Sequence, residues 1–172
     1  MVHKTLKILA LLLLTGSLYA ASEQPFIGIE VGYVDLKGDT YAEVRHKGKG
    51  VEYGLRVGAQ NDEWRTTVLL NYFNSDKDDQ NVERGILSLD YFFLSGTNYQ
   101  SIFKPFIGVS LGYANYESTT IDDSDFIYGG QGGIILNLLE QLDMDVGYRY
   151  MLSASDVFDN QSNLFLGINY LY

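Results

Sequence analysis

The 172-residue chain contains no cysteine, which excludes disulfide bonds, metal sites built on thiolates and lipid attachment through an N-terminal cysteine. Basic residues are also scarce, because 12 lysines and arginines stand against 22 aspartates and glutamates, for a net charge of −10. Nucleic-acid phosphates require many lysines and arginines, so we expect no nucleic-acid partner. Histidine and proline each occur twice, whereas glycine occurs 18 times and tyrosine 14 times. The fold must therefore use glycine and tyrosine repeatedly.

The chain also lacks an apolar run long enough for a membrane-spanning helix, which needs about 20 residues. Its longest apolar stretch, Ile8–Leu14, follows Lys4 and Lys7 and precedes small residues around Ala20. A basic start, a short apolar centre and a small-residue end are typical of a secretory signal peptide. We therefore expect residues 1–20 to be removed on export and residues 21–172 to form one domain.

Apolar and polar residues alternate along the remaining chain, as in half-buried strands, and no helical period is sustained. The alternation covers eight segments, at 27–33, 51–59, 64–72, 84–93, 107–113, 126–137, 142–150 and 164–172. Polar connections at 35–50, 74–81, 115–125 and 153–162 alternate with short links at 60–63 and 137–141 and a middle link at 94–104. This pattern indicates an all-β fold, an eight-stranded antiparallel up-and-down barrel, with the four polar connections outside the cell.

Such a barrel is either a soluble ligand carrier with an apolar interior or a transmembrane barrel whose apolar face contacts lipid. The large apolar side chains would overfill an eight-stranded interior. The polar face instead carries small residues, namely Gly28, Gly32, Gly54, Gly58, Gly108, Gly112, Gly129, Gly133, Gly147 and Gly167. The sequence therefore predicts a transmembrane barrel.

Aromatic residues on the apolar faces support the same orientation, because they gather toward both ends, as membrane-interface girdles do. One predicted girdle contains Tyr33, Tyr53, Tyr72, Tyr113, Phe126, Tyr128, Tyr148 and Tyr150, and the other contains Trp64, Tyr91, Phe93, Tyr170 and Tyr172. A soluble barrel has no reason to sort its aromatic residues to both rims.

A nine-residue sequence occurs twice, as PFIGIEVGY at 25–33 and as PFIGVSLGY at 105–113. Each copy begins a predicted strand, and the two strands are four apart in a barrel of eight. Duplication of a half-barrel and convergence on one structural task both explain such a repeat, and one sequence does not separate them.

The polar faces carry five acidic and four basic residues that we expect to form an ion-paired network in the lumen, because unpaired buried charges are costly. These residues are Glu30, Glu52, Asp90, Asp143 and Asp145, together with Arg56, Arg65, Arg84 and Arg149. Neighbouring strands predict the pairs Glu30–Arg56 and Arg65–Asp90, with Arg149 and Asp145 joining from the seventh segment. A charge-lined conduit is the alternative, although wide channels belong to much larger barrels.

The last segment, LFLGINYLY, ends on an aromatic residue with apolar residues at every second position before it: Leu164, Leu166, Ile168, Tyr170 and Tyr172. This pattern resembles the C-terminal assembly signal of bacterial outer-membrane barrels. The chain as a whole resembles the OmpA/OmpX-type (opacity or porin-like) eight-stranded family of Gram-negative bacteria. The resemblance implies an integral outer-membrane location, contact with lipid and lipopolysaccharide, and assembly by periplasmic chaperones and the outer-membrane insertion machinery. With no segment after Tyr172, we expect no peptidoglycan-binding domain.

The residues favour a structural or surface-interaction role, in adhesion or envelope integrity, for a monomer without enzymatic activity, cofactor or metal. Some similar barrels are lipid A deacylases with a His-Ser pair on a strand, but here the histidine left after export, His46, lies in a connection between Arg45 and Lys47. We expect the acidic runs at 76–79 and 122–125 to be solvated, since neither has EF-hand spacing. A low-conductance pore and a lipid A-modifying enzyme remain the alternatives, and the sequence names no loop partner.

Overall fold

The computed structural model describes residues 24–37, 40–41, 44–45, 48–75, 80–93, 102–117, 122–154 and 160–172. The predicted signal peptide at 1–20, His46 and parts of the predicted long connections lie outside these ranges. No helix within the described ranges is long and apolar enough to cross a membrane.

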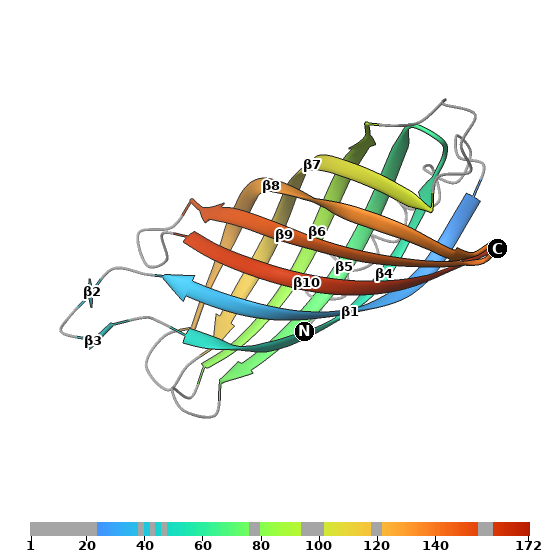
Figure 1. The fold of residues 1–172 in the computed structure, drawn as a ribbon. Coiled ribbons are helices and arrows are strands. Elements are labelled where there is room, and N and C mark those ends of the chain that lie inside the picture. The colour runs from blue at the N-terminus through green and yellow to red at the C-terminus, as the bar shows by residue number, and fades with distance from the viewer. Residues whose placement is uncertain are drawn as a thin grey trace, which may run out of the picture.

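Eight long antiparallel strands close into a barrel (Figure 1). They are β1 (Gln24–Lys37), β4 (Gly48–Gln60), β5 (Trp64–Ser75), β6 (Gln80–Phe92), β7 (Phe103–Glu117), β8 (Asp122–Leu139), β9 (Leu142–Ser153) and β10 (Asn160–Leu171). Their order around the barrel is β1-β10-β9-β8-β7-β6-β5-β4, so the first and last strands pair and close the ring. The predicted eight-stranded antiparallel up-and-down barrel is therefore confirmed.

The barrel has two different ends, which we call the loop end and the turn end. At the loop end, β1 and β4 are joined by a connection that contains a short hairpin of β2 (Thr40–Tyr41) and β3 (Val44–Arg45), which projects at the left of Figure 1. At the turn end, β1 begins beside the C-terminus, because the backbone N–H of Tyr172 donates to the carbonyl of Pro25 at 3.0 Å. The sequence did not predict the small hairpin.

Two short turns join strands at the turn end. Between β4 and β5, the side-chain oxygen of Asn61 accepts hydrogen bonds from the backbone N–H groups of Glu63 and Trp64, at 2.8 and 2.7 Å. Between β8 and β9 the turn is shorter than the predicted link at 137–141, because β8 continues to Leu139 through a register shift after Asn137. Backbone pairing thus continues where the polar sequence suggested a connection.

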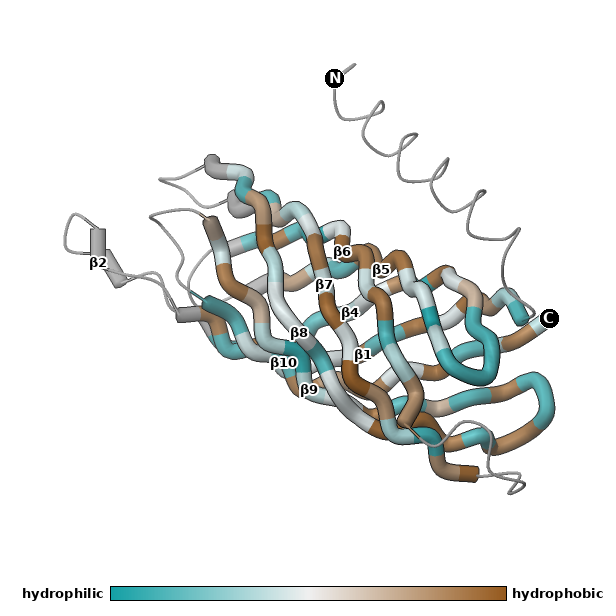
Figure 2. The backbone as a smooth tube through the Cα atoms, turned by 90° about the horizontal axis from the view of Figure 1, so that it is seen from above, coloured by the Kyte–Doolittle hydropathy of each residue, from teal (hydrophilic) through white to brown (hydrophobic). Residues whose placement is uncertain are grey.

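The two faces of each strand have opposite character, and brown and teal segments alternate along the chain in Figure 2. On β4, Tyr53 and Leu55 are 62% and 64% exposed, whereas Glu52 and Arg56 are 1% exposed. Every residue of the two predicted aromatic girdles is exposed. The apolar face is therefore outside and the charged face inside, which is the arrangement of a barrel in lipid.

The repeated sequence occupies opposite walls of the barrel, because three strands separate β1 from β7 on either side. Both copies place a phenylalanine inside, since Phe26 and Phe106 are only 1% and 3% exposed. The predicted separation of four strands is therefore correct.

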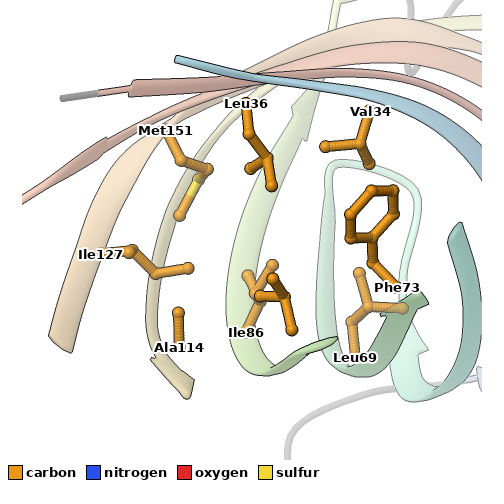
Figure 3. Packing of buried hydrophobic residues seen from close by; sticks show 9 residues of the cluster. Val34, Leu36, Leu69, Phe73, Ile86, Ala114, Ile127 and Met151 are labelled. Atoms are coloured by element: carbon orange, nitrogen blue, oxygen red, sulfur yellow. The ribbon is translucent and has the colours of Figure 1, made fainter. Parts of the chain in front are cut away.

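The interior is more apolar than we expected from the polar faces alone. One buried cluster lies toward the loop end, where side chains from six strands point toward one another (Figure 3). It consists of Val34, Leu36, Leu69, Phe73, Val82, Ile86, Ala114, Ile127 and Met151, which we call the apolar plug. A second cluster contains Phe92, Phe106, Ile135 and Phe165. These residues share the inward phase of the charged residues, so burial inside the barrel, and not contact with lipid, removes them from water.

Candidate functional site: a closed polar network in the lumen

All nine charged residues expected in the lumen are buried inside the barrel. Their exposed fractions lie between 0% for Arg65, Asp90 and Asp145 and 4% for Arg84 and Asp143. The strand alternation alone places them there, because each lies an even number of residues from another inward residue on its strand. The structure places six of the nine in a central ring, two in a cluster toward the loop end, and Asp143 nearer the turn end.

The central ring starts at Glu30 on β1, whose carboxylate accepts two hydrogen bonds from Arg149 on β9, at 2.9 and 3.2 Å. Arg149 also donates through Nε to the side-chain oxygen of Gln131 on β8, at 2.7 Å. The amide nitrogen of Gln131 donates in turn to Asp90 on β6, again at 2.7 Å. Three hydrogen-bonded steps therefore lead from β1 to the far side of the lumen.

Two further arginines complete the ring. Arg65 on β5 donates to Asp90 through Nε at 2.9 Å and to Asp145 on β9 through Nη1 at 2.8 Å. Arg56 on β4 holds the same Asp145 with both ends of its guanidinium, at 2.6 and 2.9 Å. Its Nε lies 3.8 Å from Oε2 of Glu30, which returns the ring to its start.

The ring is electrically balanced, since it contains the carboxylates of Glu30, Asp90 and Asp145 and three guanidinium groups. It also links opposite walls directly, because β5 and β9 are separated by three strands on either side. Charge-assisted and bidentate hydrogen bonds are the strongest that side chains form. The ring therefore fills the middle of the lumen with strong contacts and no excess charge.

Phenylalanine rings cover the guanidinium groups. The Cζ atom of Arg65 lies 4.7 Å from the ring centroid of Phe106, and that of Arg149 lies 4.6 Å from the centroid of Phe165. Guanidinium groups stack favourably on aromatic faces, more so where water is excluded. Phe106, which belongs to the second copy of the repeated sequence, therefore stacks on the guanidinium group of Arg65.

A second polar cluster lies on the loop-end side of the ring and is interleaved with the apolar plug, since Asn71 stands between Leu69 and Phe73 on the inner face of β5. Glu52 on β4 accepts hydrogen bonds from Asn71 on β5 and from Asn163 on β10, the latter at 2.7 Å, and pairs with Arg84 on β6. Arg84 also donates to Gln161 on β10, on the opposite wall. This cluster also balances one acid against one base.

Asp143 on β9 lies nearer the turn end, where it accepts a hydrogen bond from Gln60 on β4 at 2.9 Å. Lys104 is a cation at this end, and its Nζ lies 5.9 Å from the ring centroid of Phe92. Within the described part of the chain, no group of three or more histidine, aspartate or glutamate side chains is placed to hold a metal ion.

Both expected pairs between neighbouring strands are present as ion pairs, but only Arg65–Asp90 is also hydrogen-bonded. Arg65 and Asp90 lie directly opposite each other and form an ion pair of 2.9 Å. Glu30, however, takes its hydrogen bonds from Arg149, while Arg56 binds Asp145. The Glu30–Arg56 prediction followed cross-strand neighbours only, whereas long arginine side chains in a narrow lumen reach beyond the next strand.

Sequence reasoning missed the neutral members of the network because it considered only charges. Gln60, Asn71, Gln131, Gln161 and Asn163 all hydrogen-bond to the expected charged residues. Their inward phase on each strand was the available signal.

The residues expected to form the C-terminal assembly signal lie on the outer face of β10 and, for Tyr172, directly after its last residue. Leu164, Leu166, Ile168, Tyr170 and Tyr172 are 41–61% exposed. β10 pairs with β1 over its whole length, from Lys37↔Asn160 to Phe26↔Leu171. The predicted signal therefore lies on the strand that closes the barrel.

Fold and lumen together define a class of protein: an eight-stranded barrel with an apolar girdled exterior and a charge-balanced interior belongs in a membrane and spans it with strands. Comparison with known protein families matches residues 8–170 to the family described as the outer membrane protein beta-barrel domain. The chain belongs to this family, and its place is the bacterial outer membrane, with the barrel wall in contact with lipid.

Solved structures show the same fold at low sequence identity. Neisserial surface protein A aligns with a TM-score of 0.70 at 17% identity, covering 88% of this chain and 100% of that protein. OprH from P. aeruginosa gives 0.60 at 19%, covering 87% and 100%. Ail, the attachment invasion locus protein of Yersinia pestis, gives 0.51 at 16%, covering 88% and 99%. A search of curated proteins finds no match.

Proposed function

We propose that this protein is a closed outer-membrane scaffold with a structural or surface-interaction role, in envelope integrity or adhesion, and that it neither conducts solutes nor catalyses a reaction. The central ring is the observation that carries the proposal. Its hydrogen bonds connect β4, β5, β6, β8 and β9 across the lumen to β1. A side-chain network that binds opposite walls to each other leaves little room for a solute path.

The apolar plug supports the same function from the loop end. All nine of its residues are at most 1% exposed. An apolar constriction opposes the passage of ions, because ions lose their hydration there. Ring and plug are therefore two barriers in series, with different chemistry.

The long connections at the loop end are the parts of the chain that bind other molecules, because binding residues are commonly found on loops held by a rigid scaffold. Lipopolysaccharide is the partner that surrounds such loops in the outer membrane, and the scaffold acts as a monomer. Non-catalytic function is supported by the sequence, since no described strand carries a histidine to serve as general base.

Planar-bilayer recording of the refolded protein tests closure. We expect no stable current steps, whereas an Arg65→Ala/Asp145→Ala variant, which removes the ring's link between β5 and β9, should give measurable steps. Stable steps from the wild-type protein would support the low-conductance pore instead.

The surface role needs a cellular test. A deletion strain should show increased sensitivity to detergent or reduced attachment to host matrix proteins. Wild-type protein should restore the phenotype, and a variant whose 38–47 segment is replaced by a short turn should restore it only in part. Full restoration by the shortened variant would assign the role to the barrel wall.

A further inference from the structure

Two lumen glycines lie at points where side-chain contacts pass over a strand. Gly167 on β10 lies between Glu30 on β1 and Asp145 on β9 in the strand register. A Cβ atom built on Gly167 would collide with Nη1 of Arg56 and Oδ1 of Asp145. The bidentate ion pair between β4 and β9 therefore occupies the space that any side chain at position 167 would need.

Gly32 on β1 has the same relation to a second contact. Asn163 on β10 donates to Glu52 on β4, and β1 lies between these two strands. The three atoms nearest to a Cβ built on Gly32 all belong to the Asn163 side chain. The hydrogen bond passes over β1 where β1 has no side chain.

These two positions differ from some of the other glycines of the barrel. At Gly129 and Gly133 the nearest obstacle to a Cβ is a backbone carbonyl of the neighbouring strand. On the outer face, a Cβ on Gly85 would meet only Leu70 Cδ2, at the ordinary contact distance of 3.8 Å. Gly32 and Gly167 are thus obstructed by the lumen network itself, whereas Gly85 is not obstructed.

We infer that Gly32 and Gly167 are positioning residues for closure of the lumen. Because neither has a side chain, the Asn163–Glu52 and Arg56–Asp145 contacts can pass over their strands. This inference rests on the proposed closed-scaffold function and assigns part of it to backbone positions. Gly108, in the second copy of the repeat, has a related place, because Asp90 reaches Gln131 across β7 there.

Alanine substitution tests the inference, with Gly85→Ala as the matched control on the outer face. In urea unfolding from lipid vesicles, Gly167→Ala and Gly32→Ala should raise the unfolding equilibrium constant by about tenfold, as a change of one to two kcal/mol does. Gly85→Ala should leave the transition unchanged or move it to higher urea, because alanine costs less backbone entropy than glycine. Equal behaviour of all three variants would overturn the inference.

A rescue experiment separates positioning from general strain. In an Asn163→Ala background, Gly32→Ala should lose most of its effect, because the side chain it collides with is gone. A full effect in that background would contradict the inference, and this arm decides the matter even if Gly167→Ala fails to fold.

Bilayer recording then separates the two proposals. Current steps from Gly167→Ala but not from the wild type or Gly85→Ala would support both. A silent Gly167→Ala with a destabilised barrel would overturn the role in closure. Current from the wild type would overturn the closed scaffold, while the rescue experiment would still decide whether Gly32 positions Asn163.

Discussion

Arginine supplies all the positive charge of the central ring, and its geometry explains why. Arg65 meets Asp90, Asp145 and the face of Phe106 at the same time. A planar guanidinium offers several donors in fixed directions and a flat surface for stacking, whereas the ammonium of lysine is a strongly hydrated point charge. Three shared arginines can therefore bind all three carboxylates of the ring.

Arg56 is the residue whose loss should reveal the true pairing. Arg56→Ala should destabilise the barrel by roughly 3–5 kcal/mol, because it leaves the buried ring with three carboxylates and two guanidinium groups. Adding Asp145→Ala should recover more of that loss than adding Glu30→Ala, since Asp145 is the bidentate partner. The free energy of unfolding, measured in a double-mutant cycle, checks this.

The control for that cycle is an exposed ion pair between β1 and β4, the strands of Glu30 and Arg56. Lys49 and Asp35 lie 2.8 Å apart, with the lysine side chain 62% exposed. Lys49→Ala should change the stability little, because solvent screens such pairs. Greater recovery of the Arg56→Ala loss by Glu30→Ala than by Asp145→Ala would contradict the pairing seen here.

At the scale of the strand, alternation in the sequence was sufficient to place eight strands and both faces. The side-chain period of two links every residue of a strand to one face, so one assignment determines the rest. The ends of the strands were harder to predict from the sequence, because backbone pairing continues through polar residues, as at the end of β8 beyond Asn137. Inward apolar residues such as Leu69 and Phe73 were missed because a polar lumen was assumed.

The last strand gives a prediction about assembly. Tyr172→Ala should slow insertion into the outer membrane and leave more unfolded protein with periplasmic chaperones. The finished barrel should keep its stability, because Tyr172 is 61% exposed and its backbone N–H, which donates to the Pro25 carbonyl, is kept in the variant. Pulse-chase conversion to the heat-modifiable folded form measures the rate.

Tyr148→Ala is the matched control, because Tyr148 is also an outward tyrosine, 51% exposed, but lies in the middle of β9. It should insert at the wild-type rate. Equal rates for Tyr172→Ala and the wild type would count against a terminal assembly signal.

At the scale of the whole molecule, contacts across the lumen were beyond the reach of the sequence. Register between neighbouring strands follows from turns and alternation, but the partner of Arg65 on β9 or of Arg84 on β10 depends on how strands tilt when the barrel closes. Closure of the barrel also determines over which glycines these side-chain contacts pass. The sequence thus predicts which residues are inside, and only the closed barrel decides which of them meet.

The orientation of the barrel in the membrane is the last prediction, and the absence of cysteine makes it easy to test. Lys49 lies at the loop end and Asp62 in a turn at the opposite end, and both are exposed. Outer-membrane barrels place long loops outside the cell and short turns in the periplasm. A membrane-impermeant maleimide should therefore label Lys49→Cys on intact cells. Asp62→Cys should react only after the outer membrane is permeabilised. Labelling of Asp62→Cys alone on intact cells would reverse the orientation and, with it, the assignment of the loop end as the interaction surface.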